Sequence, residues 1–176
     1  LQKGIDAHKK GKIEEAEKYY KKILDIQPSH SHANHNLGLI AAYRGTIDEA
    51  ILLFKIATKT SPNIEQFWIS YINVLINEKN SEEAEAISRK AIEFKKDFIV
   101  IQGNLGVILH KQGRFDEAVL QYKKVIEFNK NEALAHNNLA IVLQEIGKLE
   151  EAEISYKKAI KLKSDYAEAY NSFGSL

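Results

Sequence analysis

The sequence predicts an all-α protein in which helical hairpins stack into a solenoid. Alanine recurs every 34 residues without insertion, and an acidic pair directly precedes each of these alanines: Ala16, Ala50, Ala84, Ala118 and Ala152. Small and apolar residues between them recur near the 3.6-residue helical period. A fixed period of this length is typical of repeat proteins, whose units bury their apolar faces only by stacking on neighbours.

Each unit contains two predicted helices, as the second unit shows. Its first helix is expected between Ala33 and Tyr43, and Gly45 ends it because Gly tolerates the left-handed conformation common at helix ends. The second helix begins near Asp48, whose carboxylate complements the positive end of the helix dipole. Pro62 then ends this helix because Pro cannot continue it.

Two further columns keep the same phase and indicate how the hairpins pack. A Gly lies five residues before the Ala in four units, as Gly11, Gly45, Gly113 and Gly147. An aromatic residue lies four residues after the Ala in four units, as Tyr20, Phe54, Tyr122 and Tyr156. The third unit departs from both columns with Lys79 and Ser88, and it has Ile72 where other units have Gly or Ala. We expect the Ala to let two backbones approach and the ring to fill the space beside it.

The period also sets the domain organisation. We expect one continuous solenoid domain over residues 1–176, with repeats at 1–30 (partial), 31–64, 65–98, 99–132, 133–166 and 167–176 (partial). Asp165 and Glu168 resemble a capping box that opens the last helix. The chain starts at Leu1 without Met, so we expect a longer parent. A half repeat ending at Leu176 lacks its covering helix, and we expect it to fray or to associate end to end with another copy.

These residues resemble the tetratricopeptide repeat, a 34-residue helix–turn–helix family. The features follow in order in the fifth unit, as Asn138-Leu139-Ala140, Gly147, Ala152, Tyr156 and Ala159. The resemblance covers essentially the whole chain. It implies a right-handed superhelix of about five repeats plus a partial sixth, whose first helices line a concave groove that binds an extended peptide or a helix of a protein partner.

The resemblance also implies which residues face the groove. A column of small polar residues recurs at one position of the first helices, followed by Leu in three units and by Tyr71 in the third, as Asn36, Ser70, Asn104 and Asn138. Neighbouring groove positions carried over from the family are His35, Leu39, Tyr43, Asn73, Asn77, Val107, His110, Asn137, Ile141 and Gln144. Amide side chains offer both a donor and an acceptor, which suits the main chain of a bound segment. Alternatively, these Asn residues space neighbouring helices and recur because the units were duplicated.

The densest aromatic cluster lies in the third unit, at Phe67, Trp68 and Tyr71. One interpretation is that these rings refill the volume lost at Ser88. The other is that Trp68 anchors a ligand, because Trp is frequent among the residues that dominate binding energies.

Composition excludes several other functions. Lys and Arg number 25 against 24 Asp and Glu, so net charge of +1 favours neither nucleic acid nor an anionic membrane. Cysteine is absent, and no catalytic or phosphate-binding motif is present. His32 and His35 could share a helix face beside His30, but no further ligand of suitable spacing accompanies them, so we predict no metal, no cofactor and no enzyme.

The sequence therefore predicts an interaction scaffold, with a cytoplasmic location by default. Basic residues are missing from the positions that related proteins use to grip the acidic C-terminus of heat-shock chaperones, so we do not expect that role. An alternative follows from the amide column, which is similar to the repeat region of peptide O-linked N-acetylglucosamine transferases. The chain would then be the substrate-docking arm of a larger glycosyltransferase or other transferase.

Overall fold

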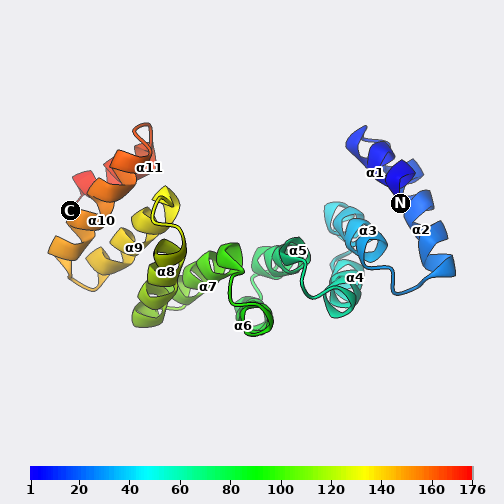
Figure 1. Ribbon diagram of the computed structural model, residues 1–176, viewed down its shortest axis with the longest axis horizontal. Helices are drawn as coiled ribbons and strands as arrows, with labels where there is room; N and C mark the ends of the chain where they lie inside the picture. Colours follow the sequence, from blue (N-terminus) through cyan, green and yellow to red (C-terminus); the bar gives the residue numbers. More distant parts are fainter. Residues whose placement is uncertain (176) are drawn as a thin grey trace. The chain divides into compact units, whose positions relative to one another are not determined.

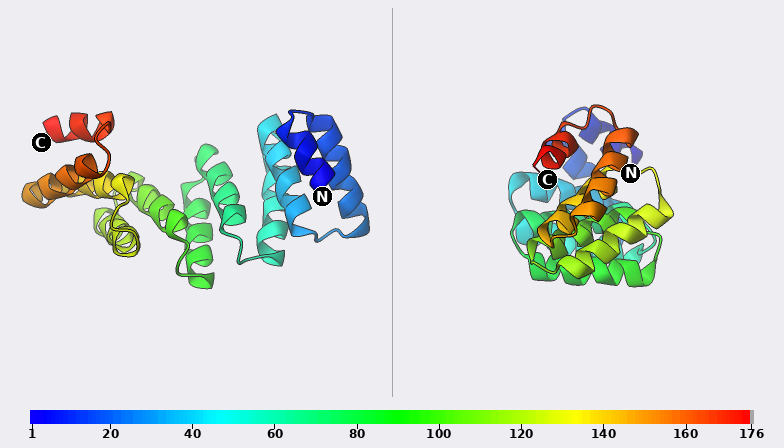
Figure 2. Two further views of the ribbon diagram at one scale, coloured as in Figure 1. Left: turned by 45° about the horizontal axis from the view of Figure 1, so that its top comes forward. Right: turned by 90° about the vertical axis from the view of Figure 1, so that its left-hand side faces the viewer.

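The structure, a computed structural model, describes residues 1–175, and this part contains eleven helices and no strand. The all-α prediction is therefore confirmed. Successive helices pair as antiparallel hairpins, which Figures 1 and 2 show from three directions. The first five pairs and the final single helix are α1 (Gln2–Lys9) with α2 (Ile13–Ile26), α3 (Ser31–Arg44) with α4 (Ile47–Thr60), α5 (Glu65–Asn77) with α6 (Ser81–Phe94), α7 (Ile99–Lys111) with α8 (Phe115–Phe128), α9 (Ala133–Glu145) with α10 (Leu149–Leu162), and α11 (Ala167–Gly174).

Contacts divide the chain into two compact units, Leu1–Lys95 and Lys96–Leu176. In the first unit α2 packs on α3 and α4 packs on α5, so each hairpin rests on the next. The second unit repeats this arrangement through α8 with α9 and α10 with α11. The expectation of one continuous domain over the whole chain stays a prediction.

The Ala column forms the seam of every hairpin. All five of its members are fully buried, and so is the ring that follows four residues later in four of the units. Three of these rings lie against Gly4, Gly38 or Gly106 on the first helix of their own hairpin, and the fifth hairpin has Ala140 at that position. A Cβ added at Gly38 would stand 2.8 Å from Phe54 Cε1, and one added at Gly106 would stand 2.7 Å from Tyr122 Cε1. The expected packing of small residues against rings is thus present.

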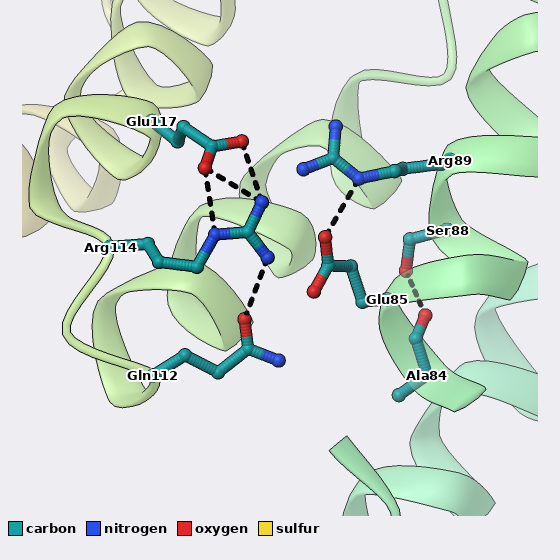
Figure 3. A network of polar contacts seen from close by, with 7 residues as sticks. All are labelled: Ala84, Glu85, Ser88, Arg89, Gln112, Arg114 and Glu117. Carbon is teal, nitrogen blue, oxygen red and sulfur yellow. Dashed lines mark hydrogen bonds and ion pairs between the residues drawn. The ribbon is translucent and has the colours of Figure 1, made fainter. Parts of the chain in front are cut away.

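In the third hairpin the large and the small residue exchange places between the two helices. Ile72 takes the position of the Gly and Ser88 the position of the ring, and both side chains are fully buried. The Ser88 hydroxyl donates a hydrogen bond to the Ala84 carbonyl 2.7 Å away, within its own helix (Figure 3). Ser88 therefore satisfies its polar atom locally, and the larger Ile72 supplies the apolar volume.

The turns inside the hairpins explain the Gly column. Four Gly residues there have φ between 72° and 80°, the left-handed region that Gly adopts without steric cost. In the third hairpin Lys79 has the same conformation, with φ of 58°. The corresponding turn of the fourth hairpin also carries Arg114, whose guanidinium donates to Glu117 and Gln112 over 2.7 to 3.2 Å (Figure 3).

The turns between hairpins are closed by a second repeating contact. In four repeats, a side-chain N–H near the start of the first helix donates to the carbonyl six residues earlier: Asn34 to Pro28, Trp68 to Pro62, Gln102 to Lys96 and His136 to Lys130, over 2.7 to 3.1 Å. The four donor side chains are buried, and a buried donor without a partner is costly, so each of these bonds stabilises its turn. We call this set the turn-closing column.

Helix starts follow the sequence prediction only in part. The second helices do carry acidic residues in their first turns. The capping box expected at Asp165 is wrong: the cap position before α11 is Tyr166, and no side chain accepts a hydrogen bond there. In the described chain Tyr170 of α11 is half exposed, and the ring centroid of Phe173 lies 6.0 Å from that of Tyr156. Leu176, the last residue of the predicted half repeat, lies outside the described residues.

Candidate functional site

The second unit contains a groove between its first helices, where the sequence predicted peptide binding. It has a volume of about 210 Å³ and lies between α7 and α9, with α8 beneath. We call it the α7–α9 groove, lined by Ile99, Val100, Gly103, Asn104, Val107, Tyr122, Val125, Glu132, Leu134, Ala135 and Asn138. Three of the predicted site residues, Asn104, Val107 and Asn138, thus come together.

The two amides of this groove are its principal polar groups. Asn104 and Asn138 occupy the same position in consecutive repeats and are both half-buried. Within residues 1–175 neither side chain makes a hydrogen bond to another protein group, so each keeps a donor and an acceptor for a ligand. Their surroundings are apolar, which strengthens any hydrogen bond that they form.

Gly103 opens the groove. Other repeats carry His35, Ile69 or Asn137 at this position, and only Gly leaves the helix surface bare. A Cβ added at Gly103 would meet a single atom within 4 Å, Val125 Cγ2 at 4.0 Å, so the space beside it is open. Sequence reasoning missed this residue, although the absence of a side chain one position before Asn104 was visible in the repeat alignment.

Tyr122 forms the floor of the groove. Its ring lies against Gly106, and the side chain is almost completely buried. Burial disfavours the charged phenolate and raises the pKa of Tyr122 well above its ordinary value. The groove floor is therefore neutral, and the carboxylate of Glu132 is the charged group in its lining.

The corresponding face of the first unit is closed by side chains. His35 is 6 % exposed and stacks on Phe67, with ring centroids 4.6 Å apart and planes at 28°. Its Nε2 lies 2.9 Å from the hydroxyl of Ser70, and its Nδ1 lies 3.3 Å from Oδ1 of Asn36. Three predicted groove residues thus bind one another across α3 and α5.

The protonation state of His35 follows from this packing. Burial disfavours the imidazolium and lowers the pKa of His35 below its ordinary value, the bond to Asn36 opposes this shift, and nearby His32 adds to it. A neutral ring that donates from Nδ1 to Asn36 accepts from the Ser70 hydroxyl at Nε2. Gln66 in turn donates to Ser70 over 3.4 Å. The resulting chain of bonds holds the first unit's face together.

The remaining predicted groove residues are distributed between surface and core. Leu39, Tyr43, Asn73 and Asn77 are exposed in the first unit, Tyr43 at 83 %. In the second unit His110 contacts Glu145 at 3.0 Å, Gln144 accepts from the Tyr156 hydroxyl at 2.8 Å, and Ile141 is half-buried. Asn137 is fully buried.

Trp68 is 4 % exposed, and its indole N–H is bonded to the Pro62 carbonyl at 2.8 Å. Its role in the turn-closing column favours the packing interpretation over a ligand anchor facing the first-helix side.

Metal-binding clusters and membrane-spanning helices are both absent from the described residues. None of the groups of three or more His, Asp or Glu side chains in residues 1–175 is placed to hold a metal ion, the three His near the start of α3 included. In the same residues, no helix has the length and apolarity needed to cross a membrane.

The family models that match the chain all describe the same repeat. Two models described as tetratricopeptide repeat match residues 1–64 and 133–166, and one described as TPR repeat matches residues 106–147. Together they cover well over half of the chain, which belongs to the tetratricopeptide repeat family. No curated protein matches it in sequence.

Solved structures share the fold. YrrB, described as a TPR protein with an unusual peptide-binding site, superposes with a TM-score of 0.80 at 21% identity, covering 98% of this chain and 89% of YrrB. MamA superposes with a TM-score of 0.81 at 21% identity over 94% of this chain and 96% of MamA. A second MamA structure, MSR-1 C2, gives 0.72 at 25% identity, with 94% and 95% covered.

Proposed function

We propose that the protein is an interaction scaffold that binds an extended segment of a partner protein in the α7–α9 groove. The observation that carries this proposal is the pair of half-buried amides, Asn104 and Asn138, which lie one repeat apart in an apolar groove and make no side-chain hydrogen bond to residues 1–175. The description of YrrB as a TPR protein with a peptide-binding site supports the proposal at the level of the fold.

The chemistry of the groove suits main-chain recognition. An extended peptide presents alternating C=O and N–H groups, and each Asn can accept from one and donate to the other. Val107 and Leu134 provide apolar contacts on either side and exclude water from these bonds. Binding should therefore tolerate many partner sequences and depend little on salt, because Glu132 is the charged group of the lining.

The first unit contributes less in this proposal. Asn36 and Ser70 share the phase of the groove amides, but both are already bonded to His35. Breaking that chain of bonds to bind a peptide would leave buried polar atoms without partners, which costs about 1–3 kcal/mol. We therefore expect the amides that bind the peptide main chain to begin at Asn104.

The test starts from peptides selected for binding to the 176-residue chain from a random display library. Their affinities are then measured by fluorescence anisotropy for three variants: Asn104→Ala/Asn138→Ala, Gly103→Leu and the control Asn73→Ala. Each hydrogen bond contributes about 0.5–1.5 kcal/mol, so loss of both amides should weaken binding roughly tenfold or more. Gly103→Leu should fill the groove and abolish binding.

Asn73 is an exposed amide of the first unit outside the groove, so its change should leave affinity unaltered. Circular dichroism confirms that each variant is folded. Peptides that bind both groove variants as tightly as the parent would show that the amides have a structural role only, and the proposal would then be wrong.

Substrate docking for a larger transferase would use the same pair of amides, since it also requires main-chain recognition. Reading the parent gene beyond the codon for Leu176 separates this role from a free-standing scaffold. A catalytic domain there would favour the docking arm, and the peptide measurements would keep their meaning.

A further inference from the structure

The first unit has a second, larger groove on the side of its second helices. It has a volume of about 570 Å³ and lies between α4 and α6, above α5. We call it the α4–α6 groove. This volume falls within the range of sites that enclose a sizeable side chain or small ligand, about 300–1,000 Å³. None of the predicted peptide-groove residues lines it.

The floor of the α4–α6 groove is aromatic. Trp68 and Tyr71 come from α5, and their polar atoms are already satisfied: the indole donates to the Pro62 carbonyl at 2.8 Å and the phenol donates to Glu83 at 3.2 Å. Both side chains are almost completely buried, with 4 % of Trp68 and 1 % of Tyr71 exposed, so they underlie the floor and present only an edge to it. Phe94, at the end of α6, is 54 % exposed and, with Pro62 and Ile87, supplies the accessible apolar surface of the groove.

The rim of the groove is cationic. Lys55 and Lys59 lie one helical turn apart on α4, and Lys90 lies on the opposite wall, whereas Glu93 is the acidic residue in the lining. Lys55 is paired with Glu83 at 3.6 Å. Lys59 and Lys90 have no ion pair within residues 1–175, so both charges are available to a ligand.

We propose that the α4–α6 groove is a second binding site, which takes an acidic peptide segment containing one large apolar side chain. The apolar side chain would pack on Phe94 and Ile87 above the buried Trp68, and flanking carboxylates would pair with Lys59 and Lys90 on the two walls. Lysine charges on both sides of an apolar floor complement this pattern and disfavour a purely apolar or a basic segment. The site is independent of the amide groove of the second unit.

The residue beneath this groove distinguishes the third repeat from the other repeats. Lysines also occur at the phase of Lys90 in other repeats, but the phase of Trp68 carries Asn34, Gln102 and His136 there. The indole at this position fills the space beneath the groove floor while keeping the turn closed. Trp68 thus closes the turn with its N–H and supports the groove floor with its ring.

The experiment uses the 176-residue chain and the fluorescence of Trp68, its single tryptophan. The probe is the synthetic peptide Asp-Glu-Asp-Phe-Glu-Asp-Glu, blocked at both ends. Two matched peptides replace either all its acids by Asn and Gln or its Phe by Gly. We expect a saturable change of Trp68 emission with the probe, at least tenfold weaker binding of both matched peptides, and weaker binding as NaCl is raised.

Charge-reversed variants place the site. Lys59→Glu/Lys90→Glu should weaken probe binding at least tenfold. The control Lys161→Glu/Lys124→Glu changes lysines at the same two phases of later repeats, both exposed, and leaves net charge equal to that of the test variant. It should bind as the parent does.

Two results would overturn the proposal: no saturable change of Trp68 emission at millimolar probe, or equal losses in the test and control variants, which would indicate only a general charge effect. Failure here leaves the amide groove untouched, because that groove is measured with other peptides and other variants.

Discussion

The exchange of volumes between Ile72 and Ser88 predicts strong energetic coupling between two positions 16 residues apart. Elsewhere the same pair of positions holds a small residue and a ring, including Ala140 with Tyr156. The perturbation restores that pattern in the third hairpin with Ile72→Ala and Ser88→Phe, singly and together. Ile72→Ala alone leaves a cavity in a fully buried site and should cost about 2–5 kcal/mol.

Ser88→Phe alone should also destabilise. In the three hairpins with Gly at the position of Ile72, a single added Cβ would stand only 2.7–2.8 Å from the ring, so a whole Ile side chain cannot coexist with a ring there without displacement. Overpacking of this kind costs about 1–3 kcal/mol. In the double variant the ring fills the space that Ile72 vacates, and the loss should be at least about 2 kcal/mol smaller than the sum of the single losses.

Urea denaturation followed by far-UV circular dichroism measures the four unfolding free energies of this cycle. The reciprocal variants Ala140→Ile and Ala140→Ile/Tyr156→Ser provide a matched control, in which the second change should recover part of the loss caused by the first. Single losses that add to within about 0.5 kcal/mol in the third hairpin would refute the reasoning, because coupled neighbours do not behave additively.

Three other predictions concern the turns, the seam and the buried imidazole. Lys79→Gly should raise the unfolding free energy by about 0.5–1 kcal/mol, because it relieves a side chain held at φ of 58°; an unchanged urea midpoint would contradict this. Ala118→Leu should lower stability by about 1–3 kcal/mol by overpacking a fully buried position, and an unaltered thermal melt would show that the Ala column is not the seam. Because the pKa of His35 is lowered in the folded state, the unfolded state binds more protons as pH falls below about 6.5, so this contribution to stability should be present above that value and be lost progressively below it. His35→Gln should lose less stability as pH falls, and parallel pH curves for the two proteins would argue against the assignment.

The hairpin architecture could be predicted from the sequence because it depends on local and periodic signals. The Ala seam, the rings against Gly and the left-handed turns each recur in several repeats, so a single exception such as Ser88 does not hide the pattern. Helix-start signals were less reliable. Asp165 and Glu168 have the spacing of a capping box, but the helix begins one residue later than that box requires.

The site was harder to predict because it depends on what lies opposite each residue. Position in the repeat indicated that Asn104 and His35 face the same side of their helices, yet one is half-buried in a groove and the other is buried against Phe67. The difference comes from neighbours on the next helix: Ser70 and Phe67 cover His35, while Gly103 leaves space beside Asn104. The position of a residue within its repeat determines the direction in which its side chain points, but not the size of the neighbouring side chains on the next helix.

The turn-closing column has a consequence for how duplicated units diverge. An amide, an indole and an imidazole all reach the same carbonyl, from Asn34, Trp68 and His136 respectively. The turn requires one side-chain N–H within reach of this carbonyl, and side chains of very different sizes can supply it. Mutation can therefore exchange one buried donor for another without opening the turn, and each repeat can fill the space beside its turn differently. A chain of similar repeats can in this way change the interior of one repeat, as Trp68 does in the third, while the turns on either side stay closed.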